Sequence, residues 1–253
     1  IFFIVSRVNR WKEGRELLER RSFPCKHKRL DEIRDSAASR KSQNMDKLEL
    51  VSLTGRGRAE ALRMLLIVSK TPFVDHRVNL IQWKEYKKHE QLPEDTKLPL
   101  MRINNKRTIV GSVEIGRFIA QQVGLYGKSK TEEKEIDEIV SVVESLQPNL
   151  TPVLRAALAK DFIKRKESWA EYKDSTLTPA LEVLTEKLGD SVFFIGHSLT
   201  WADIAVAEVL SRFSNCFDGN FIHNHPILKQ HMMMIEREPT LARYIADRPS
   251  STF

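Results

Sequence analysis

Two positions in the sequence leave backbone groups open for chemistry. Ser112 precedes a predicted helix over 113–123, and the free amides and the dipole at such a helix start favour an anion. Leu98 precedes Pro99, and since proline tolerates a cis peptide bond, this step predicts that the backbone groups of Leu98 turn outward. The structural alternatives are a simple N-cap serine and a plain edge-strand proline. Ser112 therefore predicts an anion site, and the Leu98-Pro99 step predicts outward-facing backbone groups.

Trp83 and Lys87 form a second candidate pair. They are four residues apart, which places both side chains on one face if the polar segment 82–91 is helical. Such a pair offers an aromatic surface and a cation to one ligand. A solvated lysine beside a partly buried tryptophan is the structural alternative, and the spacing alone leaves both open.

Metal and disulfide chemistry are not predicted. His223, His225 and His231 cluster in the sequence, but no acidic ligand or His-Glu-x-x-His spacing accompanies them, so a structural role is favoured. The two cysteines, Cys25 and Cys216, leave no disulfide framework and no Cys-x-x-Cys motif. The sequence also has no apolar run near the ~18 residues that a membrane-spanning helix needs.

The elements that must position these residues fall into two groups. Strand signals occupy four segments, 48–52, 73–78, 98–103 and 107–110. The first two are separated by a helix that opens at Gly55-Arg-Gly57, and the last two flank a tight Asn-Asn-Lys turn. This order predicts an α/β unit of about 80 residues. Beyond residue 127 apolar residues recur at helical spacing, so the second domain is predicted to be all helix.

The positive charge is concentrated at the N-terminal end. The chain has 253 residues, with 41 Lys and Arg against 34 Asp and Glu, a net charge of +7. Residues 1–44 hold twelve of these basic residues and six of the acidic ones. The rest is therefore almost neutral. We interpret 1–44 as a basic extension, flexible or partly helical, and Met45 as a natural start for the folded body.

Four motifs in the body, in order, resemble those of cytosolic glutathione transferases, most closely the sigma class that includes haematopoietic-type prostaglandin D synthases and many nematode enzymes. They are Gly55-Arg-Gly-Arg-Ala-Glu60 with Arg63, Leu98-Pro99, Gly196-His-Ser-Leu-Thr-Trp-Ala-Asp203, and Arg248-Pro-Ser-Ser-Thr-Phe253. The resemblance covers nearly all of 46–253. It implies a thioredoxin-like, glutathione-binding N-terminal domain (46–124) followed by an all-α C-terminal domain (126–253). Thr200 to Asp203 also forms a capping box, which is structural.

The resemblance assigns roles to individual residues. The backbone of Leu98, before Pro99, pairs with the cysteinyl part of glutathione, and Ser112 holds the γ-glutamyl carboxylate with Gly111 before it. Trp83 and Lys87 grip the glycine end of the tripeptide. Further implied positions are Ser52 and Arg58 at the thiol, and Lys97 as a polar contact beside the proline.

Three positions depart from the family pattern. Ser52 stands where sigma-class enzymes have the tyrosine that stabilises the thiolate, and Thr54 is a competing hydroxyl. Gly111 replaces the glutamine of a Gln-Ser pair. Ser141 replaces an acidic residue that the partner subunit offers to glutathione, with Asp137 one turn earlier. The positive charge of Arg58 would partly compensate for the missing tyrosine.

The sequence thus leads to two hypotheses. The first is a cytoplasmic, homodimeric glutathione transferase of sigma-like type that takes part in detoxification. It would join glutathione to small apolar electrophiles, or isomerise substrates with glutathione, without a metal or a membrane. The second is a weak or inactive relative that binds apolar ligands or partner proteins. Nucleic-acid binding through residues 1–44 is a third, less favoured class.

Overall fold

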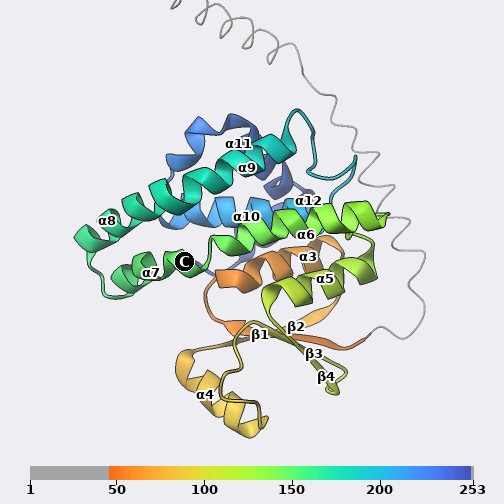
Figure 1. Cartoon of the computed structure of the whole chain (residues 1–253). Coiled ribbons are helices and arrows are strands. Elements are labelled where there is room, and N and C mark those ends of the chain that lie inside the picture. The colour runs from red at the N-terminus through yellow and green to blue at the C-terminus, as the bar shows by residue number, and fades with distance from the viewer. Residues whose placement is uncertain (1–45, 252–253) are drawn as a thin grey trace, which may run out of the picture. The chain divides into compact units, whose positions relative to one another are not determined.

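Four short strands form one sheet in the computed structural model, which describes residues 46–251 (Figure 1). They are β1 (Leu48–Leu53), β2 (Phe73–Val78), β3 (Leu100–Ile103) and β4 (Arg107–Val110). Their order is β2-β1-β3-β4, with β1 and β2 parallel and the other pairs antiparallel. All four strands confirm the sequence prediction, and the turn at Asn104 and Asn105 has the positive φ of a tight hairpin.

The two faces of the sheet follow from alternation along β1. Leu48 and Leu50 belong to the large core shared with the helices, whereas Val51 packs on the other side with Val78 and Trp83. Helices α3 (Glu60–Val68) and α5 (Ser112–Val123) cover the first face, and α4 (Leu80–His89) covers the second (Figure 1). The short 3-10 turn η1 (Gly57–Ala59) leads into α3.

The remaining elements are all helical among the described residues. In chain order they are α6 (Lys130–Ser145), η2 (Pro148–Leu150), α7 (Thr151–Leu158), α8 (Phe162–Tyr172), η3 (Lys173–Leu177), α9 (Thr178–Leu188), α10 (Trp201–Cys216), η4 (Phe221–Asn224), α11 (Pro226–Glu236) and α12 (Pro239–Asp247). The mixed sheet followed by a helical part is the predicted glutathione-transferase architecture, and it confirms the fold class.

Helix α10 is the centre of the helical part. Every residue from Trp201 to Phe213 is buried, and the helix contacts α3, α5, α6 and α11. Its start confirms the predicted capping box, because Asp203 accepts hydrogen bonds from both the backbone and the hydroxyl of Thr200, at 2.8 and 2.7 Å. The same carboxylate accepts from the Phe194 amide and lies 2.9 Å from His231 Nε2. His231 is therefore tied to helix packing.

None of the helices in the described range has both the length and the apolar character to cross a membrane. The basic segment 1–44, including Cys25, lies outside the described residues.

Candidate functional site

The Leu98-Pro99 step and Ser112 lie side by side. The Leu98-Pro99 peptide bond is cis, as predicted. The Gly111 amide donates a hydrogen bond to the Pro99 carbonyl at 2.9 Å, which joins the start of β3 to the start of α5. Gly111 has φ 98°, a conformation that favours glycine. Glycine, which stands here in place of the family glutamine, therefore adopts the backbone conformation of this turn readily.

Trp83 and Lys87 lie together on α4, which confirms that this segment is helical. Trp83 is buried against the second face of the sheet, and the partly buried Leu98 packs against the same cluster. Lys87 Nζ lies 5.8 Å from the centre of the Trp83 ring and donates to the carbonyl of Glu94 at 2.7 Å. Lys97 is exposed in the loop that leads to Leu98. The residues implied for the glycine and cysteinyl ends of glutathione thus gather around α4.

Ser52 faces away from that cluster. Its side chain is on the α3 face of β1, and the residue is only 2% exposed. The hydroxyl donates to the Leu53 carbonyl at 3.2 Å and accepts a hydrogen bond from Arg63 Nη2. Thr54, two residues on, is exposed. Of the two hydroxyls near the end of β1, the one at the family's tyrosine position is therefore buried and already bonded.

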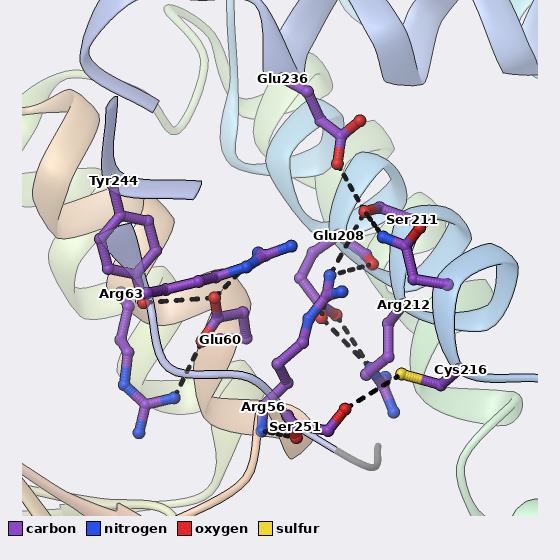
Figure 2. Close-up of polar contacts among 12 residues, drawn as sticks. Arg56, Glu60, Arg63, Glu208, Ser211, Arg212, Cys216, Glu236, Tyr244 and Ser251 are labelled. Atoms are coloured by element: carbon purple, nitrogen blue, oxygen red, sulfur yellow. Dashed lines mark hydrogen bonds and ion pairs between the residues drawn. The ribbon is translucent and has the colours of Figure 1, made fainter. Parts of the chain in front are cut away.

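Arg63 is the centre of a buried ionic network. Its Nε donates to Asp75 at 3.0 Å and its Nη1 to Glu60 at 3.0 Å. Glu60 also accepts from Tyr244 at 3.2 Å and from Arg248 at 3.0 Å. Figure 2 shows Arg63 and Tyr244 converging on Glu60. The network attaches the C-terminal helix α12 to α3, so the role of Arg63 in the first motif is structural.

Glu144 joins the site although the sequence reasoning missed it. Its Oε1 accepts a hydrogen bond from the Ser112 hydroxyl at 2.8 Å, and its Oε2 lies 4.0 Å from Arg58 Nη1. The Ser112 hydroxyl, which the resemblance assigns to the γ-glutamyl carboxylate of glutathione, therefore already donates to a carboxylate of its own chain. The available signal was helical spacing, since Glu144 is four residues after Val140 and borders the buried stripe of α6.

The two α6 residues that the sequence did single out lie elsewhere. Ser141 is exposed. Asp137 is held within its own chain, because its carboxylate accepts from Arg117 at 3.0 Å and from the Tyr126 hydroxyl at 2.6 Å. Asp137 is therefore already neutralised by a neighbouring arginine.

A small cavity lies next to the Ser112–Glu144 pair. Its volume is about 20 Å³, and its polar lining comprises Arg58, Ser112, Glu144, Gln147, Glu208 and Arg212. This space suits a water molecule but not a tripeptide. Side chains at its rim must therefore move, or the ligand must lie outside it, before glutathione contacts Ser112.

A second buried network lies behind this cavity. Arg56 Nη2 is 3.3 Å from Glu208 Oε1, and Arg212 Nε is 3.2 Å from the same oxygen. Arg56 Nε is buried and has no hydrogen-bond partner. Figure 2 shows Arg56 and Arg212 on either side of Glu208. Cys216 lies at its edge, and burial raises the pKa of the Cys216 thiol. The thiol is thus kept in its less reactive protonated form.

The predicted residues therefore form a partly connected site. Trp83, Lys87 and Leu98 gather around α4, and Pro99 connects them to Ser112 through the Gly111 bond. Arg58 reaches this group through Glu144, whereas Ser52 does not join it. No group of three or more metal-ligating side chains occurs within residues 46–251.

Comparisons with known proteins match this fold. A family model for "Glutathione S-transferase, C-terminal domain" matches residues 149–248. Glutathione S-transferase 1 of Ascaris suum is 26% identical over 83% of this chain and 100% of its own length. Human hematopoietic prostaglandin D synthase is 26% identical over 82% of this chain and 99% of its own length.

A solved structure agrees with these relatives. The monomeric glutathione S-transferase Na-GST-3 of the hookworm Necator americanus is 26% identical, covers 82% of this chain and 100% of its own, and superposes with a TM-score of 0.71. The helical-domain match, the relatives aligned over nearly their whole length and the shared architecture show that the chain is similar to glutathione S-transferases in both the sheet part and the helical part.

Proposed function

We propose that this protein is a glutathione transferase of sigma-like type. It would conjugate glutathione to small apolar electrophiles, or isomerise substrates with the help of glutathione. The observation that carries the proposal is the hydrogen bond between the Gly111 amide and the Pro99 carbonyl, because it holds together the residues that we propose for the cysteinyl and γ-glutamyl ends of glutathione. The names of the relatives, which include transferases and a prostaglandin D synthase, support both reactions.

The tripeptide would lie along the edge of the sheet. Its glycine end would meet Trp83 and Lys87, its cysteinyl backbone would pair with Leu98, and its γ-glutamyl carboxylate would approach the amides at the start of α5. Lys97 would add charge to the entrance. Each of these contacts uses a group that the fold already presents near α4 or α5.

Arg58 is the residue that we propose for thiol activation. The thiolate is the nucleophile, and a nearby fixed positive charge favours it over the thiol. The Arg58 side chain is 43% exposed and only loosely paired with Glu144, so it is free to turn toward the sulfur. Ser52 is less suited to this role because its hydroxyl is already held by Arg63 and Leu53.

The second candidate function is a non-catalytic member of the family. It is favoured by one observation, that Glu144 already bonds the Ser112 hydroxyl. A serine hydroxyl that already donates to a carboxylate of its own chain is less available to the γ-glutamyl carboxylate of glutathione. Such a protein would bind apolar ligands or partner proteins on the retained fold.

Calorimetry with glutathione separates the two candidates. Binding at micromolar to millimolar concentration is expected for the transferase, and an absence of heat at millimolar glutathione would overturn it. We also propose a homodimer. Since the similar Na-GST-3 is monomeric, the oligomeric state needs its own measurement, and sedimentation of the same sample provides it.

Single variants then identify the activating group. Arg58→Ala should lower the rate of conjugation by about a hundredfold, the cost of one preorganised group at a developing charge. Ser52→Ala should change the rate little, and Thr54→Ala tests the exposed, competing hydroxyl, with little change expected there too. The thiolate absorbance of bound glutathione provides a second readout. A large loss of conjugation rate in Ser52→Ala, with no loss in Arg58→Ala, would assign thiol activation to Ser52.

A further inference from the structure

Three large apolar side chains are exposed at the turn between α7 and α8. Leu158, Phe162 and Ile163 are 67%, 75% and 76% exposed. They lie within six residues, at the end of α7 and the start of α8, at the left edge of the molecule in Figure 1. Single exposed apolar residues are ordinary on protein surfaces, but three within six residues at this α7–α8 tip form a candidate interaction site.

The tip is firmly held in place. The Asp161 carboxylate accepts from the Lys164 amide at 2.9 Å and caps α8. Arg165 donates to the carbonyl of Cys216, at the end of α10. One turn further, the Trp169 ring stacks on Phe217 with centroids 5.1 Å apart. The apolar side chains are therefore presented by an anchored helix and not by a frayed end.

Three lysines flank these side chains in the sequence. Lys160, Lys164 and Lys166 are all exposed. None of the three ammonium groups forms an ion pair with any residue between 46 and 251. Nearby acidic residues are Asp161, which caps the helix, and Glu167. The tip thus combines exposed hydrocarbon with unneutralised positive charge.

We propose that the α7–α8 tip docks on the surface of an anionic lipid bilayer. Phe162, Ile163 and Leu158 would enter the boundary between headgroups and acyl chains, and the three lysines would meet lipid phosphates and carboxylates. Amphipathic segments bind membranes without crossing them in this way, by burying apolar side chains at the interface and pairing basic side chains with anionic lipids. The site is separate from the residues proposed for glutathione, and it would bring the protein close to membrane-dissolved apolar compounds.

The charge pattern favours a membrane over a second copy of this chain. In a symmetric dimer each patch meets its own equivalent. The three lysines of one tip would then face three lysines of the other, and Asp161 is already used as a cap. A uniformly negative surface, in contrast, attracts all three lysines of the tip.

Vesicle co-sedimentation of the full chain tests the proposal. Vesicles of phosphatidylcholine with phosphatidylserine should retain the protein, whereas phosphatidylcholine alone should retain much less. The double variant Phe162→Ser/Ile163→Ser should lower the partition coefficient about tenfold or more, because two large side chains lose their burial. Lys160→Glu/Lys164→Glu/Lys166→Glu should weaken binding in a salt-dependent manner.

The chain offers a matched control at the start of α4. Leu80 and Ile81 are 67% and 71% exposed, and they follow a capping Asn79 as Phe162 and Ile163 follow Asp161. Leu80→Ser/Ile81→Ser should bind vesicles like the unmodified chain. Circular dichroism would verify that each variant is folded.

Several outcomes would overturn the proposal. One is a lack of binding by the unmodified chain. Another is unchanged binding of Phe162→Ser/Ile163→Ser, which would assign the lipid affinity to the basic segment 1–44. A third is equal binding to neutral vesicles. A fourth is a change of oligomeric state in the tip variants with no loss of vesicle binding, which would make the tip a contact between copies.

Discussion

At the scale of single residues, the bond between Ser112 and Glu144 bears most directly on the proposed site. The Ser112 hydroxyl donates to Glu144, whose other oxygen is near Arg58. One carboxylate therefore engages two groups that glutathione would need, one for its γ-glutamyl end and one for its thiol. A hydrogen bond to a charged group contributes about 1.5–3 kcal/mol, so its removal is large enough to measure.

Replacing Glu144 with Gln tests this competition. Glu144→Gln keeps the shape of the side chain but removes the negative charge that would oppose the γ-glutamyl carboxylate. We expect glutathione to bind about tenfold more tightly, as measured by calorimetry. Glu135→Gln, an exposed position on the same helix, makes the same change in net charge and should leave the affinity unaltered. Weaker binding in Glu144→Gln would show that Glu144 supports the ligand.

At the scale of elements, the contact between α5 and α10 sets the position of the proposed anion site. The indole of Trp201, the first residue of α10, packs on the backbone of α5 at Gly116. A β-carbon added at Gly116 would lie 2.4 Å from Trp201 Cζ2, which is shorter than any real contact of this kind. Since Trp201 is buried, the ring has little room to move. The helix that begins at Ser112 is thereby located relative to Glu144 and Arg58.

Gly116→Ala should therefore destabilise the protein. Alanine favours a helix by about 1 kcal/mol, but overpacking a rigid core typically costs 1–3 kcal/mol, so the net effect is a loss. Denaturant unfolding would measure it. In the background Trp201→Leu, which shortens the opposing side chain, the cost of Gly116→Ala should shrink or change sign. Equal costs in both backgrounds would contradict the proposed clash.

At the scale of the whole molecule, tyrosine hydroxyls join elements that are separate in the chain. Tyr126 reaches Asp137, Tyr172 donates to the Leu146 carbonyl at 2.9 Å, and Tyr244 connects α12 to Glu60. Burial, with added contributions from neighbouring charges, raises the pKa of Tyr126 to about 12. Burial likewise raises the pKa of Tyr86, Tyr172 and Tyr244. These are all four tyrosines of the chain.

This pattern predicts loss of stability in alkali. Below pH 10 a tyrosine is neutral in both states and contributes no pH dependence. Above pH 10 the unfolded chain releases the proton while the folded chain keeps it, so the free energy of unfolding falls as the pH rises toward 12. The slope is up to about 1.4 kcal/mol per pH unit for each tyrosine, and less for the partly exposed Tyr86.

Absorbance titration of tyrosinate checks this prediction. The native protein should show little tyrosinate at pH 10, whereas the protein in denaturant should titrate near that pH. Tyr126→Phe, which cannot ionise, should reduce the alkaline slope of the unfolding free energy. Native tyrosinate that appears at pH 10 would contradict the burial argument.

Local patterns in the sequence determined most of the architecture. Alternation in 48–52 predicts β1, the step at Leu98-Pro99 predicts a cis bond, and Thr200 with Asp203 predicts the start of α10. The structure confirms each of them. They are predictable because each depends on residues only a few positions apart, whose steric and hydrogen-bonding preferences act within one strand, turn or helix end.

The tertiary structure alone decided which groups are free to act. Ser52 is eleven residues from the Arg63 that holds its hydroxyl, and Ser112 is 32 residues from Glu144. Local periodicity carries no information on such pairs, because they form only when separate elements pack and buried polar groups must find partners. The sequence thus determined a glutathione-transferase-like fold and its candidate site residues. The packing of α3, α5 and α6 decided that the Ser52 hydroxyl is bonded to Arg63 and that the Ser112 hydroxyl is bonded to Glu144.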